Sequence, residues 1–197
     1  MSVYERLTDR SRKVMQMASQ EAQRLGHEYV GTEHVLIALA KEGSGVAANA
    51  IRLHIDLGML RVEVERRCSQ GPAIITLGKL PLTPAVKRAF AYAEEEMGSL
   101  GHNWCGTEHI LLGLLRLENG TVKDVFDGLG VSPAAVRESV VGLLPPAVLR
   151  APLEFSKEEA VHILKAMQLY VTAAAVMHVG NREIDSAYEK LKNLTGG

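Results

Sequence analysis

Glutamate and histidine occur together twice in the chain, in two strings of nearly the same composition. The first string is GHEYVGTEHVLIALA at residues 26–40, and the second is GHNWCGTEHILLGLL at residues 101–115. A metal site would need at least three ligands that converge with a defined geometry, and neither HExxH nor CxxC accompanies the strings. We therefore predict no metal and expect the histidines to order loops by hydrogen bonding to the backbone. These residues are His27, His34, His102 and His109.

The threonines and glutamates of the strings are typical of helix starts. Thr32 and Thr107 are favourable N-cap residues, and Glu33 and Glu108 would fall in the first turn, where negative charge suits the helix dipole. In that position each glutamate would stabilise its own helix, by about 0.3–1 kcal/mol.

Other residues that could do chemistry lack the partners that catalysis requires. Cys105 precedes the second GTEH, but Val30 takes its place in the first string, which favours a packing role. No GxSxG is present, and Glu94, Glu95 and Glu96 are expected to form a solvated helix face rather than an acid–base pair. The sequence thus predicts neither a catalytic residue nor a cofactor.

The strings belong to a longer internal repeat, which indicates how they are positioned. Residues of the second copy follow those of the first by 75 positions, and identical pairs extend beyond the strings. Among these pairs are Leu7/Leu82, Thr8/Thr83, Ala18/Ala93, Glu21/Glu96 and Leu25/Leu100. Apolar residues recur at steps of three and four in both copies, so each should fold as helices.

Start and stop signals divide each copy into four helices. Gly26 and Gly101 should end the first helix of each copy, and Thr83-Pro84 should start it in the second. Ser44 and Thr121 are expected to cap the third helix. The fourth should begin at Ser132-Pro133 in the second copy and occupy about residues 56–67 in the first, with residues 71–81 linking the copies.

Composition excludes several classes of protein. Of 197 residues, 47% are hydrophobic and 23% charged, which is sufficient for a core, and the net charge of −1 gives no footprint for nucleic acid or an anionic membrane. The start MSVYERLTDRSRK lacks an apolar signal segment, and the apolar run at 169–179 is too short to span a bilayer. With two cysteines, expected to be reduced, the sequence predicts a cytoplasmic protein.

The C-terminal segment has no relation to the repeat. Ser156-Lys157-Glu158-Glu159 has the pattern of a capping box, and Gly180-Asn181 would separate two helices. We predict a helical hairpin over residues 147–197. It either packs on the repeats or on a second copy of itself, giving a homodimer, or it forms a methionine-containing groove for a partner helix.

The duplicated GHxxxGTEHxLxxL string, the YERLTDRSRKVM opening and the LTP start of the second copy resemble the N-terminal domain of the Clp/Hsp100 unfoldases, in particular the ClpC and ClpA branch. The resemblance covers about residues 3–145. It implies an all-α module of two four-helix repeats that receives substrates and adaptor proteins for a ring ATPase, which threads them into the ClpP peptidase. In the ClpC branch the glutamates of the two GTEH motifs belong to pockets for phosphorylated arginine, and the resemblance would make Thr32, Glu33, Thr107 and Glu108 ligand-binding residues here. In such a pocket the carboxylate would pair with the guanidinium, and free amides of the first turn would hold the phosphate. The alternative is that each glutamate only stabilises its own helix.

The chain departs from the unfoldases in lacking a phosphate-binding loop. Gly78-Lys79 has neither the upstream glycine, because Ala73 stands there, nor a following serine or threonine, because Leu80 does. We expect no ATPase activity, and the sequence leaves open whether this is a natural small protein or an excised piece.

The sequence therefore predicts an all-α protein of two parts. Residues 1–146 should hold the double repeat, with one copy at about 3–70 and the other at about 80–145, related by a pseudo-twofold axis in one bundle. The expected function is non-catalytic, as a substrate- or adaptor-binding accessory of a Clp-type ATP-dependent protease. Its partners would be Clp ATPase or peptidase subunits, adaptors and clients. The alternative is a free-standing sensor or scaffold without a link to the protease.

Overall fold

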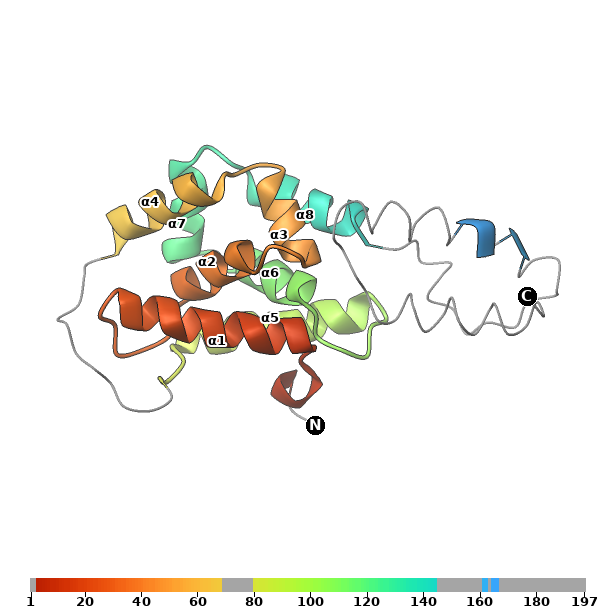
Figure 1. Ribbon diagram of the computed structural model, residues 1–197, viewed down its shortest axis with the longest axis horizontal. Coiled ribbons are helices and arrows are strands. Elements are labelled where there is room, and N and C mark those ends of the chain that lie inside the picture. Colours follow the sequence, from red (N-terminus) through yellow and green to blue (C-terminus); the bar gives the residue numbers. More distant parts are fainter. Residues whose placement is uncertain (1–2, 69–79, 145–160, 163, 167–197) are drawn as a thin grey trace. The chain divides into compact units, whose positions relative to one another are not determined.

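The computed structural model describes residues 3–68, 80–144, 161–162 and 164–166, and these residues are helical apart from their connections (Figure 1). A 3-10 helix at Val3–Arg6 precedes the α-helices and packs on α5. The first copy forms α1 (Asp9–Arg24), α2 (Thr32–Glu42), α3 (Val46–Arg52) and α4 (Leu57–Arg67). The second forms α5 (Pro84–Ser99), α6 (Thr107–Leu115), α7 (Thr121–Gly128) and α8 (Pro133–Gly142). The predicted all-α fold, with four helices in each copy, is confirmed.

The chain divides into two compact units, Met1–Val141 and Gly142–Gly197. Of the second unit, the structure describes little beyond a few helical positions between 161 and 166. The predicted hairpin at 147–197, its proposed dimer or groove, and the predicted boundary at 146 lie outside the described residues. None of the helices in the described ranges has both the length and the apolar character needed to cross a bilayer.

The first unit is layered around α2 and α6. Figure 1 shows α1 and α5 on one side of this central pair and α3, α4 and α7 on the other, and α1 packs on α2 as α5 packs on α6. All residues from 32 to 39 are buried, as are nearly all of α6, because both helices are apolar around their whole circumference. The core therefore places the starts of these two helices, which carry the GTEH motifs, deep in the unit.

The helix ends follow local capping rules, with one correction to the prediction. Thr8 and Thr83 cap α1 and α5 through their side chains, and Gly26 and Gly101 follow those helices with φ of 72° and 69°. The N-caps of α2, α3, α6 and α7, however, are Gly31, Gly45, Gly106 and Gly120. The predicted caps Thr32 and Thr107 are the first residues inside their helices, and Ser44 and Thr121 flank the glycines that cap α3 and α7.

The two copies exchange backbone hydrogen bonds in a reciprocal way. The Val30 N–H donates to the Pro81 carbonyl at 2.8 Å, and the Thr83 N–H donates to the Val30 carbonyl at 3.1 Å. At the equivalent place Cys105 bonds to Arg6 at 2.8 Å and Thr8 to Cys105 at 3.1 Å. Leu7 thus pairs with Cys105 as Leu82 pairs with Val30, so the loop before α2 or α6 lies against the start of the other copy.

The 75-residue offset changes to 76 after the third helix. Asp56 caps α4 and Ser132 directly precedes α8, because the second copy has one extra residue in the preceding turn. With this register the buried positions coincide, Leu60 with Val136 and Val64 with Val140. Arg61 then becomes the counterpart of Arg137. A constant offset of 75 residues does not show this equivalence.

The prediction of a solvated face at Glu94–Glu96 is wrong for Glu96. This residue is buried and forms an ion pair with Arg137, while Glu94 pairs with Arg6 and only Glu95 is exposed. Glu21, the equivalent residue of the first copy, is also buried. The physical reason is that Glu96 faces α8, which supplies a cation for it, whereas helical periodicity alone does not show which neighbour a charged position faces.

Candidate functional site

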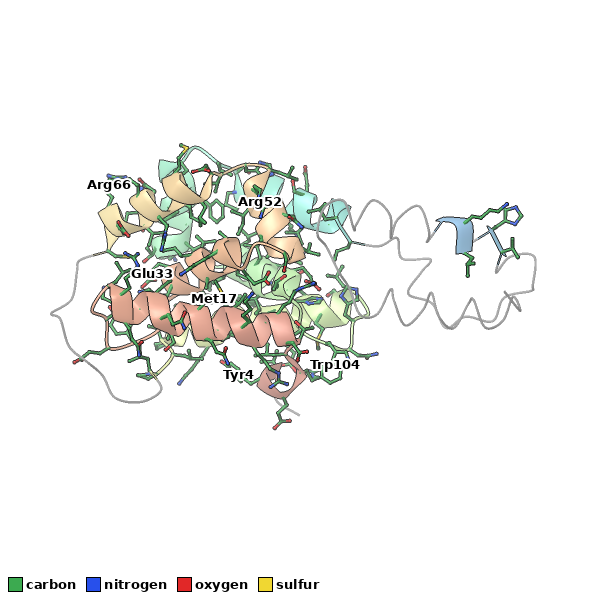
Figure 2. The ribbon with its side chains drawn as sticks, in the orientation of Figure 1. Tyr4, Met17, Glu33, Arg52, Arg66 and Trp104 are labelled. Atoms are coloured by element: carbon green, nitrogen blue, oxygen red, sulfur yellow. The ribbon has the colours of Figure 1, made fainter. Side chains whose placement is uncertain are left out.

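Each GTEH motif forms a corner where a loop turns into a buried helix. We define the first corner as His27 together with Gly31–His34, at the start of α2. The second corner is His102 together with Gly106–His109, at the start of α6. Glycine is the N-cap in both, followed by threonine, glutamate and histidine as the first three helical residues. Figure 2 places Glu33 of the first corner and Trp104, in the loop of the second corner, toward opposite ends of α1, so the corners are separate.

The buried histidine of each corner takes the N–H of the glycine cap. In the first corner the Gly31 N–H donates to Nδ1 of His34 at 2.8 Å, and Nε2 of His34 lies 2.9 Å from Nδ1 of His27. Because Nδ1 of His34 accepts, its proton must sit on Nε2, which then donates to His27. His34 is therefore neutral. Burial favours the same state, because it lowers the pKa of His34 to about 4.

The second corner repeats this arrangement. The Gly106 N–H donates to Nδ1 of His109 at 2.9 Å, and Nε2 of His109 lies 2.7 Å from Nδ1 of His102. The imidazole rings of the two pairs meet edge to face, with centroids 4.9 Å apart in the first corner and 4.8 Å in the second. The prediction that these histidines order a loop through backbone hydrogen bonds is confirmed for His34 and His109.

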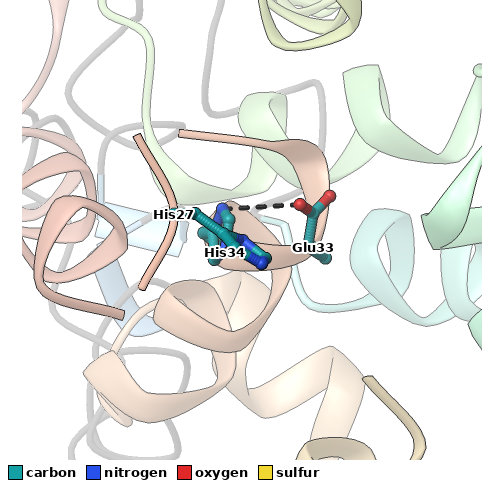
Figure 3. Close-up of side chains that lie close together, drawn as sticks. All are labelled: His27, Glu33 and His34. Atoms are coloured by element: carbon teal, nitrogen blue, oxygen red, sulfur yellow. Dashed lines mark hydrogen bonds and ion pairs between the residues drawn. The ribbon is translucent and has the colours of Figure 1, made fainter. Parts of the chain in front are cut away.

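A metal ion competes poorly with these hydrogen bonds. One ligand atom each from His27, Glu33 and His34 lies within 4.8 Å of the others (Figure 3). The second corner has the same grouping of His102, Glu108 and His109. Both ring nitrogens of His34, however, already bond within the protein, to Gly31 and to His27. A metal on His34 would break one of these bonds, so the geometry favours loop ordering over coordination.

The glutamates fold back over the glycine caps. A Cβ atom placed on Gly31 would lie 2.1 Å from Oε1 of Glu33, and one on Gly106 would lie 2.2 Å from Oε1 of Glu108. Neighbouring threonine hydroxyls lie at the limit of hydrogen-bonding distance, Thr32 at 3.4 Å from Glu33 and Thr107 at 3.5 Å from Glu108. Each carboxylate thus covers the N-terminus of its own helix, where the dipole favours negative charge.

Both carboxylates are nearly buried and lack a close cation. Their side chains are 10% and 12% exposed, and the adjacent neutral imidazole lies 3.5 Å away in each corner. In the described part of the chain, no lysine or arginine lies within 4.0 Å of Glu33 or Glu108. Burial raises the pKa of Glu108, although its own amide, His102 and the more distant Arg10 offset part of that effect. Each corner therefore holds an acid whose counter-charge could come from a ligand.

An exposed aromatic residue lies in the loop that leads to each corner. Tyr29 is 46% exposed and stacks on His27 with ring centroids 5.6 Å apart, and Trp104 is 51% exposed. Aromatic faces attract cations such as guanidinium groups. Tyr29 and Trp104 hold equivalent positions of the repeat, so both corners combine a carboxylate with an aromatic side chain in the preceding loop.

The cysteines near the corners are unsuited to nucleophilic chemistry. Burial raises the pKa of Cys105 to about 12, and the charge of Glu108 adds to the shift. Burial likewise raises the pKa of Cys68 to about 11, with a contribution from Glu33. Because the thiolate is the nucleophile, the raised pKa values leave both cysteines protonated and weakly nucleophilic at neutral pH.

The residues predicted from sequence, Thr32, Glu33, Thr107 and Glu108, come together in pairs, one pair at each corner. Sequence reasoning missed the role of Gly31 and Gly106, although the fixed spacing of glycine before TEH in both strings was a signal. It also missed that each buried histidine bonds to the histidine seven residues earlier.

Comparison with known proteins identifies related sequences. The model of the Clp repeat (R) N-terminal domain matches residues 6–129. The probable ATP-dependent Clp protease ATP-binding subunit of Chlamydia pneumoniae is 42% identical over 151 residues, which are 76% of this chain and 18% of that protein. The chloroplastic chaperone protein ClpC of Pisum sativum is 40% identical over 144 residues, 73% of this chain and 16% of that one. The chain thus spans less than a fifth of the length of these relatives.

Solved structures show the same fold at lower identity. The N-terminal domain of the chaperone ClpD from Arabidopsis thaliana matches with a TM-score of 0.58 and 23% identity, over 71% of this chain and 95% of that one. The N-terminal domain of Hsp104 from Candida albicans matches with a TM-score of 0.58 and 20% identity, over 70% and 90% of the two chains.

Proposed function

Because the chain belongs to the family of the Clp repeat (R) N-terminal domain, we propose that it is a non-catalytic binding protein that receives substrates or adaptors for a Clp-type ATP-dependent protease. Its partners would be Clp ATPase or peptidase subunits on one side and client or adaptor proteins on the other. The two corners are the proposed binding sites for the client, with Thr32 and Glu33 in one and Thr107 and Glu108 in the other.

The observation that carries the proposal is the pair of largely buried carboxylates without a close cation. Glutamates are seldom buried unless they are paired, yet Glu33 and Glu108 have no lysine or arginine within 4.0 Å in the described ranges. A ligand with a positive group would supply the missing partner. Such a charge-assisted hydrogen bond is worth about 1.5–3 kcal/mol.

The proposed ligand group is an arginine side chain, free or phosphorylated. The planar guanidinium suits bidentate pairing with a carboxylate and stacking on an aromatic face, and Tyr29 and Trp104 are exposed in the loops beside the corners. A phosphate on the guanidinium would meet the helix N-terminus, which the glutamate already covers. Its contribution therefore has to be measured separately from that of the guanidinium.

Calorimetric titration tests the proposal directly. Phosphoarginine, arginine and inorganic phosphate are titrated separately into the full chain, into a Glu33→Gln/Glu108→Gln variant and into a Glu65→Gln/Glu95→Gln variant. The last pair are exposed surface glutamates and serve as the control. We expect two sites per chain for phosphoarginine, at least about tenfold weaker binding in the first variant, and unchanged binding in the control.

The single variants separate the corners. Glu33→Gln and Glu108→Gln should each leave one site of two. If phosphoarginine and arginine both fail to bind at millimolar concentration, the glutamates are only first-turn acids.

A separate experiment, binding of the full chain to purified Clp ATPase and peptidase subunits, distinguishes an accessory protein from a free-standing scaffold.

A further inference from the structure

The glycine caps of the two corners have no backbone reason to be glycine. Gly31 has φ −94° and ψ 172°, and Gly106 has φ −82° and ψ 176°, which is extended backbone open to any residue. Serine, threonine, aspartate and asparagine are in fact preferred at N-caps because their side chains accept a first-turn N–H. The same chain uses threonine in this way at α1 and α5.

The atoms that a side chain would meet first at these positions belong to the glutamate. The three atoms nearest to a Cβ on Gly31 are Oε1, Cδ and Oε2 of Glu33, at 2.1, 2.6 and 2.6 Å. For Gly106 they are Oε1, Oε2 and Cδ of Glu108, at 2.2, 2.5 and 2.6 Å. The space that an N-cap side chain normally fills is thus occupied by a carboxylate from two residues further along the helix.

The histidines take the role that a glutamate or glutamine usually has in a capping box. In a capping box the third helical residue, usually glutamate or glutamine, reaches back to the N–H of the cap. Here His34 and His109 do so, so the cap N–H is satisfied without a glutamate. Glu33 and Glu108, one position earlier, are left to occupy the place of the missing cap side chain.

We propose that Gly31 and Gly106 are positioning residues. Their lack of a side chain leaves the space, called the seat below, that holds the carboxylates of Glu33 and Glu108 in position for a ligand. This inference rests on the proposed function. It assigns to the glycines a role in affinity that is distinct from capping, and it makes the spacing of glycine and glutamate a requirement of the binding site.

Substitution by serine separates the two roles. Serine is a preferred N-cap, so a Gly31→Ser/Gly106→Ser variant keeps or improves the helix starts, but its Cβ displaces the carboxylates. The three nearest atoms belong to the end of a side chain rather than to backbone, so the fold should persist. We expect phosphoarginine affinity to fall at least tenfold with an unchanged or higher Tm, while Gly98→Ser, at an exposed helix glycine with open space, leaves affinity unchanged.

A second readout follows the carboxyl group itself. Burial raises the pKa of Glu108, so pushing the carboxyl out of its seat should return that pKa toward its ordinary value. A ¹³C NMR titration of Gly106→Ser, and of Gly106→Ala as the smaller substitution, measures this without any ligand. A purely structural role of the glycine would leave the pKa of Glu108 where it is.

The outcomes distinguish this inference from the proposed function. If the unsubstituted chain does not bind phosphoarginine or arginine, the proposed function fails, whatever the pKa does. If it binds and the double serine variant binds equally well, or if the pKa of Glu108 is the same in both Gly106 variants as in the parent, the seat has no role and the inference is overturned. Weaker binding with a lowered pKa of Glu108 supports it.

Discussion

Arg137 places both terminal nitrogens of its guanidinium on the buried carboxylate of Glu96, at 2.9 and 2.8 Å. This pair ties α8 to α5, and Arg116 from the end of α6 approaches the same carboxylate at 3.6 Å. The first copy has the same design around Glu21, with Lys41 at 2.9 Å and Arg61 at 3.2 Å. In each copy one acid therefore connects the first, second and fourth helices.

Removing the charge of Glu96 should destabilise the unit. We expect Glu96→Gln to lower the free energy of unfolding by about 1–3 kcal/mol, because Arg137 is only half exposed and loses the charge of its partner. Glu95→Gln, on the adjacent exposed position, should stay within about 0.5 kcal/mol. Urea unfolding of both variants measures the difference, and equal stabilities would show that the ion pair contributes nothing.

Gly113 should be intolerant of a methyl group. A Cβ there would lie 2.1 Å from the Ala89 carbonyl oxygen and 2.8 Å from the Ala93 amide nitrogen, both backbone atoms of α5. Gly113→Ala should thus cost about 1–3 kcal/mol through forced separation of α5 and α6. Gly98→Ala, in the same fold but facing open space, should instead stabilise by about 0.4–1 kcal/mol, and thermal melts distinguish the two signs.

Stability should fall as the pH is lowered below about 6.5. Burial lowers the pKa of His34 to about 4 from the ordinary 6.5, with His27 and Arg24 acting in the same direction and Glu21 opposing. Between these values the unfolded chain binds the extra proton, so the free energy of unfolding decreases as pH falls, by about 3 kcal/mol in total. Below about pH 4.5 the carboxylates of Glu21 and Glu42, whose pKa values are lowered, begin to lose their stabilising effect as well.

Replacing His34 tests the origin of this pH dependence. His34→Gln keeps an acceptor for the Gly31 N–H, as in a capping box, but does not titrate, so its stability should vary less between pH 7 and 5. His54→Gln, at an exposed histidine, should leave the dependence unchanged. Urea unfolding at pH 7 and pH 5 measures the change in the free energy of unfolding. If this change is the same in His34→Gln as in the parent, His34 is not its cause.

Neither copy should fold alone. Four backbone hydrogen bonds cross between the copies at Val30 and Cys105, and α4 packs on α7 while α3 packs on α6. We expect peptides of residues 1–70 and 80–146 to be weakly helical by circular dichroism and to regain helicity on mixing. A cooperative melt of either peptide by itself would contradict the expectation.

The two thiols should differ in access but not in activation. Cys105 is fully buried and Cys68 is half-buried, and burial raises both pKa values, to about 12 and about 11. At pH 8 a thiol reagent should therefore leave Cys105 unmodified and react with Cys68 more slowly than with free cysteine. Both thiols should react rapidly in denaturant. Rapid modification of Cys105 in the native protein would mean that the loop before α6 opens.

Much of the fold was predictable from the sequence because its signals are local. The apolar period identified the helices, and Gly26 and Gly101, each with positive φ, marked where α1 and α5 end. Duplication strengthened every such signal, since a pattern seen twice at one spacing is unlikely to be chance. The threonine–glutamate pairs at the starts of α2 and α6 were found for the same reason.

Features that depend on tertiary contacts were not predictable. Threonine, unlike glycine, has a side-chain oxygen that can accept a first-turn N–H, so the caps were assigned to Thr32 and Thr107. The glycines occupy that position because a carboxylate fills the adjacent space. Burial of Glu96 depends on Arg137, and the one-residue change of register hid the equivalence of Arg137 with Arg61.

Leu7 of the first copy pairs with Cys105 of the second, and Leu82 of the second pairs with Val30 of the first. Such reciprocal contacts between equivalent positions define an isologous interface. The unit is therefore built as a twofold homodimer whose two subunits have become one polypeptide. Two free subunits would associate only at sufficient protein concentration. Joined in one chain, they meet at the high effective concentration that the connecting segment sets, so the assembly survives dilution that would dissociate a dimer.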